Sequence, residues 1–162
     1  MTADARPIVD RSSSVVCVVC RAGTVVCALP VEHVSEMMRP LPVEALAGMP
    51  SFVSGVALVR GVPTPVVEST RMLGLAGPPQ TTRFVALRIG ARQAVVAVDA
   101  VLGVSTLSRE SLEELPPLLR GASSEVVDGI GRLDAGLLVL LSSAKIVPAA
   151  VWALLDAAGS PP

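Results

Sequence analysis

A segment near the N-terminus reappears later in the chain, and this internal repeat limits the folds that the chain can adopt. Residues 25–37 (VVCALPVEHVSEM) align with residues 95–107 (VVAVDAVLGVSTL) at an offset of 70 residues. The identical pairs are Val25/Val95, Val26/Val96, Val31/Val101, Val34/Val104 and Ser35/Ser105. Both copies lie in the same order of elements: a hairpin, a Val-x-x-Val segment, a long connection and a hairpin that begins with Gly. Valine is abundant, so some identities arise by chance, but the shared order predicts two units of similar design.

Short apolar runs separated by turn residues predict the strands of each unit. Hairpin turns are expected around Gly23, Gly61, Gly90 and Ala135, each between two runs of β-branched and aliphatic residues. Short strands with glycine at the corners are typical of small closed barrels. The predicted fold class is therefore mainly β, with two β-barrel subdomains in tandem.

The stretch 49–68 carries the most conspicuous residues of the chain. Arg60-Gly61 interrupts an apolar run and predicts a tight turn, in which Gly61 is free to take a positive φ. The strand after the turn contains Pro63 and Pro65, whose missing amide donors fall on one side. Because that side cannot complete a ladder of hydrogen bonds, we expect this strand at a sheet edge or at a barrel corner.

Short helices are predicted between the strands. Pro30 can begin a helix, and Val31, Val34 and Met38 then fall on one face at helical spacing. A second short helix is expected within residues 69–77.

Polar and proline-rich segments predict the domain boundaries. The expected parts are a flexible N-terminal arm (1–13), a single domain (14–155) with one subdomain at about 14–80 and another at about 81–147, a C-terminal helix (about 148–158) and a tail (159–162).

Composition excludes several classes of function. Of the 162 residues, 51% are hydrophobic and 17% are charged, which allows a sizeable core. A net charge of −1, with two Phe, one Trp and no Tyr, offers neither a cationic groove nor stacking platforms for nucleic acid. The N-terminus lacks the pattern of a signal peptide, and the longest uncharged run, 45–59, is too short to span a membrane. We expect a cytoplasmic protein that neither binds nucleic acid nor inserts directly into a membrane.

The side chains that catalysis or metal binding would need are missing. Cys17 and Cys20 have the spacing of a zinc or redox pair, but residues three apart on a strand point to opposite faces. We therefore interpret these thiols and Cys27 as core residues, and the single histidine, His33, as a surface residue. No phosphate-binding glycine loop or serine-nucleophile motif occurs. The sequence predicts a protein that is not an enzyme and has no catalytic, cofactor or metal site.

Several short motifs follow one another in order over nearly the whole chain. The first half contains V-x-E at 34–36, P-x-F-x-x-G-V at 50–56, an aliphatic-Arg-Gly motif at 59–61 and P-aliphatic-V-acid at 65–68. The second half contains VDAV at 98–101 and GIGRLDAGLLVLL at 129–141. Each motif is weak alone, but together they resemble the CheW-like chemotaxis coupling protein family from about Ser14 to Leu155.

This resemblance implies two SH3-like five-stranded barrels and a non-catalytic scaffold or adaptor. The implied partners are the regulatory domain of a CheA-type histidine kinase and the cytoplasmic tip of a methyl-accepting chemoreceptor, at membrane-associated receptor arrays. The residues that match the family's partner-binding positions are Val34, Glu36, Gly55, Val56, Arg60, Gly61, Glu68 and Val85. Within this set, Val34, Glu36 and Val85 match a receptor-facing groove between the subdomains.

For some of these positions a structural role is an equal alternative. Val34 and Val85 could be ordinary core residues. Arg60 could form a surface ion pair with Glu36 or Glu68, which would contribute little to stability.

The chain also departs from the family pattern. Leu58 stands where the family usually has Asn, and Glu68 and Ser142 stand where it usually has Asp. These departures favour a second function as an alternative, namely a divergent CheW-like interaction module in another signalling or surface-motility pathway.

Overall fold

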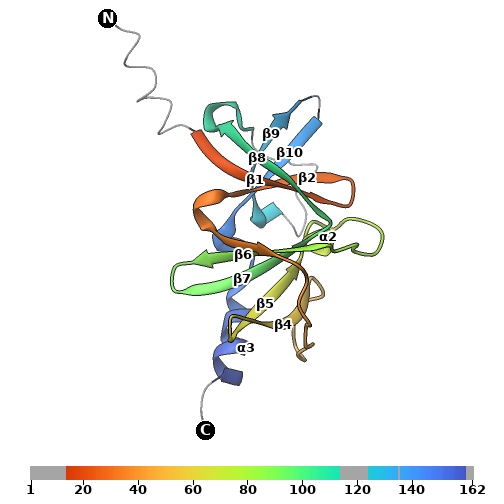
Figure 1. The fold of residues 1–162 in the computed structure, drawn as a ribbon, viewed down its shortest axis with the longest axis vertical. Coiled ribbons are helices and arrows are strands. Elements are labelled where there is room, and N and C mark those ends of the chain that lie inside the picture. Colours follow the sequence, from red (N-terminus) through yellow and green to blue (C-terminus); the bar gives the residue numbers. More distant parts are fainter. Residues whose placement is uncertain (1–13, 114–123, 135, 160–162) are drawn as a thin grey trace, which may run out of the picture.

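The computed structural model describes residues 14–113, 124–134 and 136–159 (Figure 1). The strands are β1 (Ser14–Ala22), β2 (Val25–Pro30), β3 (Val34–Met38), β4 (Val53–Val59), β5 (Val62–Glu68), β6 (Arg83–Ile89), β7 (Arg92–Val98), β8 (Ala100–Ser108), β9 (Val127–Leu133) and β10 (Gly136–Leu141). The helices are α2 (Ser69–Met72) and α3 (Ala149–Gly159), with 3₁₀ turns η2 (Val31–His33), η3 (Arg109–Ser111), η5 (Ser124–Val126) and η6 (Ser143–Lys145). The predicted mainly β fold class is confirmed.

The strands form two five-stranded sheets with the same internal order. Sheet A has the order β8-β1-β2-β10-β9, and sheet B has the order β3-β6-β7-β5-β4. When β1–β5 are matched in sequence to β6–β10, the two orders become identical. The internal repeat is therefore a repeat of structure as well as of sequence.

The sheets do not follow the two halves of the chain. β1 and β2 of the first repeat pair with β8 and β10 of the second, whereas β6 and β7 pair with β3 and β5 (Figure 1). Each repeat has thus exchanged its first hairpin with the other. The chain crosses from sheet A to sheet B through η2, and returns between β7 and β8 at Asp99. A boundary near residue 80 separates the repeats but not the sheets, so the subdomains expected at about 14–80 and 81–147 do not coincide with them.

Three apolar clusters hold the sheets together. One cluster lies inside sheet A and one inside sheet B, and each draws side chains from all five strands of its sheet. The third and largest cluster contains residues of both sheets together with Val151 of α3. Cys17 belongs to the cluster inside sheet A, while Cys20 and Cys27 belong to the shared cluster. The prediction that Cys17 and Cys20 point to opposite faces is confirmed.

The segment after Pro30 differs from the predicted helix. Only Val31–His33 is helical, as one 3₁₀ turn, and Val34–Met38 is the strand β3. The partners of β3 explain the difference, because Val34 pairs with Leu87 and the strand pairs with β6 along its length. A tertiary pairing outweighs local helical spacing here. The second predicted helix is shorter than expected, and the C-terminal helix is close to its expected bounds.

The two prolines of β5 lie where the strand has one partner. β5 pairs with β4 from Val62 to Val67, but its register with β7 begins only at Val66. Pro63 and Pro65 therefore need no partner on the side of β7. β5 is an inner strand of sheet B, yet its proline-bearing half behaves as an edge, which agrees with the predicted barrel corner.

Candidate partner-binding surface

The turn between β4 and β5 places an arginine at an exposed tip. Val59 and Val62 face each other across the hairpin, and Arg60 and Gly61 form its two-residue loop with φ of 50° and 79°. Two positive φ values in such a loop define a type I′ turn, which normally selects Asn, Asp or Gly at both positions. Arg60 therefore holds a backbone conformation that its side chain disfavours.

The Arg60 side chain joins the two outer strands of sheet B. Its Nε and Nη2 donate to Glu36 Oε2 at 2.7 Å and to Glu36 Oε1 at 3.1 Å. Glu36 lies on β3 and Arg60 follows β4, the strands at opposite ends of the sheet order, so the ion pair bridges the two edges of sheet B. The hydrogen bond from Arg60 lowers the pKa of Glu36 below its usual value. The guanidinium side chain is still 79% exposed, so it remains open to a partner.

Gly55 allows a second segment to cross β4 at very short range. Its φ is 146°, and a Cβ atom built on it would lie 2.1 Å from the carbonyl oxygen of Glu44. Glu44 and Val56 exchange two backbone hydrogen bonds of 2.8 Å at this place. Gly55 is therefore needed here for a structural reason, because any side chain at this position would collide with the backbone of the crossing segment.

The remaining predicted site residues lie apart from the tip. Val85 is completely buried in the shared core, and Val34 is partly buried against the same cluster. Val85 is therefore a core residue, the structural alternative considered for it, and cannot contact a partner. Glu68 lies at the far end of β5 from Arg60, and its Oε2 is buried without a hydrogen-bond partner among the described residues. Of the two ion pairs considered for Arg60, the structure contains the one with Glu36.

Two apolar residues beside the tip, Leu58 and Val62, are exposed although they were not among the predicted partner-binding residues, whereas Val56 was. Leu58 is 65% exposed and Val62 is 46% exposed, while Val56 is partly exposed on the same hairpin. The exposure of Val56 and Leu58 follows from alternation along β4, in which Val53, Ala57 and Val59 are buried. We define the tip surface as Glu36, Val56, Leu58, Arg60, Gly61 and Val62.

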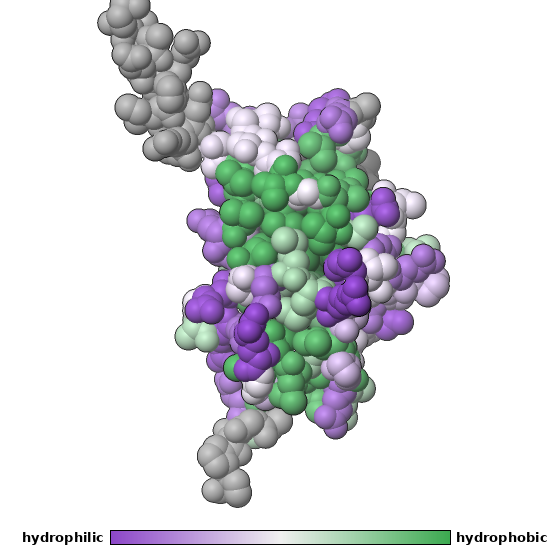
Figure 2. All heavy atoms as spheres, in the orientation of Figure 1, coloured by the Kyte–Doolittle hydropathy of each residue, from purple (hydrophilic) through white to green (hydrophobic). Residues whose placement is uncertain are grey.

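A second apolar surface lies on sheet A. Figure 2 shows apolar side chains over the part of this sheet that β1 and β8 form, and a smaller apolar area near β4 and β5. Val16, Leu102 and Val104 are exposed by 43%, 48% and 64% on these two strands. We call these three residues the β1–β8 face. Exposed apolar side chains gathered in this way are typical of a protein contact.

The described residues offer little for catalysis. They contain no cluster of three or more His, Cys, Asp or Glu side chains that could hold a metal ion. Burial raises the pKa of the Cys17 thiol to about 11 and that of Cys20 to about 12, so neither is a reactive thiolate. The His33 ring lies 3.0 Å from Ser143 Oγ, where it joins η2 to η6. Within the described part of the chain, no helix is both long and apolar enough to cross a bilayer.

The sequence profile of the CheW-like domain family matches residues 16–151. The chain belongs to this family. It is therefore a CheW-like scaffold protein without catalytic activity, as the motif order predicted. The CheW-like segment includes both sheets and the first part of α3.

Named relatives agree with this membership. The chain is 28% identical over 116 residues to the chemotaxis protein CheW of Klebsiella aerogenes, a match that covers 70% of each protein. It is 33% identical over 138 residues to the protein FrzA of Myxococcus xanthus, which covers 80% of this chain and 83% of FrzA. The crystal structure of the scaffolding protein TtCheW from Thermoanaerobacter tengcongensis superimposes with a TM-score of 0.72 at 20% identity. That match covers 85% of this chain and 90% of TtCheW, and it shows a shared fold.

Proposed function

We propose that this CheW-like chain couples chemoreceptors to a CheA-type histidine kinase, and that the tip surface binds the regulatory domain of the kinase. One observation carries this proposal. Arg60 occupies a turn position with φ of 50°, where Asn or Gly would fit without strain, and its guanidinium remains exposed. Strained residues of this kind are typical of functional sites.

The ion pair with Glu36 gives Arg60 a fixed direction. The bidentate pair uses Nε and Nη2 and orients the planar guanidinium, while the Arg60 side chain stays 79% exposed, so Nη1 remains available to a partner. A cation held in this way, next to Leu58 and Val62, has the composition of an interface centre, in which arginine and large apolar residues dominate. These features support a protein partner rather than a small ligand.

We assign the receptor tip to the β1–β8 face and not to the groove around Val34, Glu36 and Val85 that the resemblance implied, because Val85 is completely buried and Glu36 is paired with Arg60. The exposed Val16, Leu102 and Val104 of the β1–β8 face suit an apolar helix face, such as those of a helical receptor hairpin. Val34 of sheet B and Val101 of sheet A are half-buried against the core that both sheets share. A receptor on this face and a kinase at the tip surface would occupy different sheets, so one chain could hold both at cytoplasmic receptor arrays.

A divergent CheW-like module that serves another signalling or surface-motility pathway is the alternative. Leu58 favours it, because this exposed leucine stands where the family usually has a polar Asn. An apolar side chain at that place changes the chemistry that a partner must match.

The proposal is tested by replacing Arg60 and measuring the affinity for a purified kinase regulatory domain. Arg60→Asn keeps a residue that tolerates positive φ but removes the cation, so we expect unchanged or slightly higher thermal stability and an affinity about tenfold lower or weaker still. Arg60→Glu should weaken binding further, because it places a carboxylate beside Glu36.

Arg71→Glu is the matched control, since Arg71 is an exposed arginine on α2, at the end of β5 remote from the tip. Its affinity should equal that of the unmodified chain. If Arg60→Glu binds the kinase domain as well as Arg71→Glu does, at equal stability, the tip surface is not the kinase site.

A further inference from the structure

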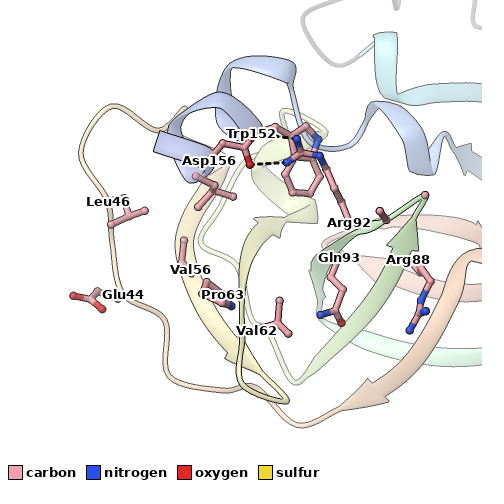
Figure 3. A pocket seen from close by; sticks show the side chains of 13 residues that line it. Glu44, Leu46, Val56, Val62, Pro63, Arg88, Arg92, Gln93, Trp152 and Asp156 are labelled. Carbon is pink, nitrogen blue, oxygen red and sulfur yellow. Dashed lines mark hydrogen bonds and ion pairs between the residues drawn. The ribbon is translucent and has the colours of Figure 1, made fainter. Parts of the chain in front are cut away.

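A pocket opens between the β4–β5 hairpin, the β6–β7 turn and α3 (Figure 3). Its volume is about 940 Å³. Its apolar lining consists of Leu46, Val56, Val62, Pro63, Trp152 and Leu155. A recess of this size and lining can receive one or more large side chains of another molecule.

One wall of the pocket is fixed by Arg92. Its Nη1 and Nη2 donate to Asp156 Oδ1 at 3.1 Å and to Oδ2 at 2.9 Å, and its guanidinium carbon lies 4.8 Å from the centroid of the Trp152 ring. Figure 3 shows the three side chains meeting where β7 approaches α3. Because this contact joins the strand to the helix, the indole is held in place before a partner arrives. A preformed wall reduces the entropy that binding must overcome.

A second arginine of the lining is uncommitted. Arg88 is exposed, and no hydrogen bond or ion pair joins its guanidinium to another described residue. Glu44, an acidic residue of the lining, lies on the opposite side of the pocket in Figure 3. The other acidic residue, Asp156, is already paired with Arg92. The lining therefore presents a cation, Arg88, on one side and a carboxylate, Glu44, on the other, with apolar residues between them.

The pocket is continuous with the tip surface. Val56 and Val62 belong to both, and Pro63 lies opposite Leu58 on the same hairpin. A partner that covers the exposed Leu58 and contacts Arg60 would thus meet the mouth of the pocket without a gap of polar surface.

We propose that the pocket receives a segment of the kinase partner in which a large apolar side chain stands beside a carboxylate. The apolar side chain packs between Trp152 and the valines of the hairpin, and the carboxylate pairs with Arg88. This inference rests on the proposed function, since it names a second contact of the same partner. It places α3 and the β6–β7 turn within the kinase-binding surface.

The single tryptophan of the chain gives a direct test. When Trp152 is replaced biosynthetically by 5-fluorotryptophan, the chain has one ¹⁹F resonance, and an unlabelled kinase regulatory domain adds none. Occupation of the pocket should shift this resonance on complex formation. A complex that forms with the resonance unmoved overturns the pocket inference and leaves the proposed function intact.

Substitutions test the chemistry of the occupant. Arg88→Glu should raise the dissociation constant about tenfold or more, whereas Arg88→Lys should recover part of the loss. Ala91→Trp should fill the pocket from an exposed position on the β6–β7 turn, outside the tip surface, and weaken binding by a similar factor at unchanged thermal stability. Arg71→Glu is again the control for a change of charge.

The outcomes separate the two proposals. If Arg60→Glu weakens the complex but Arg88→Glu and Ala91→Trp do not, the kinase site excludes the pocket. If the ¹⁹F resonance instead shifts with the concentration of the chain alone, the occupant is a second copy and the inference is wrong. If the unmodified chain binds no kinase regulatory domain, both proposals are wrong.

Discussion

Replacing Gly55 with Ala should destabilise this chain far more than the same change at two related glycines. At Gly55 the new Cβ would lie 2.1 Å from the Glu44 carbonyl oxygen and 2.9 Å from the Ala45 Cα. Both contacts are with backbone, so no side-chain rotation can relieve them. The segment that carries Glu44 must therefore move away from β4.

The size of the effect follows from what that movement breaks. The two hydrogen bonds between Glu44 and Val56, each 2.8 Å long, would be lost, at about 1 kcal/mol each. The φ of 146° adds strain of about 1–3 kcal/mol for any residue with a Cβ. We therefore expect Gly55→Ala to lower the free energy of unfolding by about 3–5 kcal/mol.

Substitutions at two other glycines allow the cost of backbone strain to be measured separately from the cost of a steric collision. Gly61 has a φ of 79° with nothing within 4 Å of a new Cβ, so Gly61→Ala should cost only the conformational term of about 1–2 kcal/mol. Gly129 occupies the equivalent place in the second repeat, since Glu113 bridges to Ile130 as Glu44 does to Val56. A Cβ there would lie 3.3 Å from Leu112 Cβ, and we expect a cost of about 1 kcal/mol from tight packing.

Urea unfolding of the three variants, followed by circular dichroism, measures these differences directly. The expected order is Gly55→Ala as the least stable, then Gly61→Ala, then Gly129→Ala. If Gly55→Ala unfolds within about 1 kcal/mol of Gly61→Ala, the close approach of the Glu44 segment does not set the requirement for glycine.

Three further results are expected. Raising the pH above 9.0 should destabilise the fold. Burial raises the pKa of Cys17 to about 11 and that of Cys20 to about 12, so the folded chain keeps both thiols protonated at pH values at which the unfolded chain loses these protons. The contribution of the thiols to stability is therefore complete below pH 9.0 and is lost as the pH rises toward the folded-state pKa values. By pH 10, each of the two thiols should lower the free energy of unfolding measured in urea by about 1.4 kcal/mol. In Cys20→Ala, the part of this loss that comes from Cys20 should be absent. Arg92→Ala should barely change the melting temperature but should increase acrylamide quenching of Trp152, and equal quenching would show that Arg92 does not shield the indole. In Arg60→Asn, the pKa of Glu36 measured by NMR should return toward 4.5, because the hydrogen bond that lowers it is absent; an unchanged value would mean that another group is responsible.

Much of the fold could be predicted from the sequence, because the repeat and the turn residues are local signals. The hairpins at Gly23, Gly61 and Gly90 follow from glycine at positive φ, and the structure contains each of them. The exchange of the first hairpins could not be predicted. Equivalent strands of two repeats carry similar apolar patterns, so β3 fits beside β6 of the other repeat as well as beside β1 of its own. The short η2 connection decides the partner, and its geometry is not visible in residue types.

The candidate site was predictable to a similar extent. The exposed Arg60 follows from the Arg-Gly turn, and Glu36 was one of two carboxylates considered for it. Val85 shows why the burial of the other predicted site residues could not be predicted from the sequence. Alternation assigns a residue to one face of a strand, but it does not show whether another sheet covers that face. In this chain the face of β6 that points away from the interior of sheet B packs on sheet A, which buries Val85 completely.

The exchanged hairpins also explain how one chain can keep two surfaces at a fixed separation. Strand β2 of sheet A continues through the three residues of η2 into β3 of sheet B, and β3 supplies Glu36 to the tip surface. The hydrogen bond between His33 and Ser143 fastens this crossing to the segment that follows β10. Both sheets contribute to the largest cluster, so neither can rotate without disrupting a buried core. Two tandem barrels joined by a linker would lack this constraint, because domains that share a small interface move relative to each other. The exchange therefore holds the β1–β8 face and the tip surface in a rigid relation to each other.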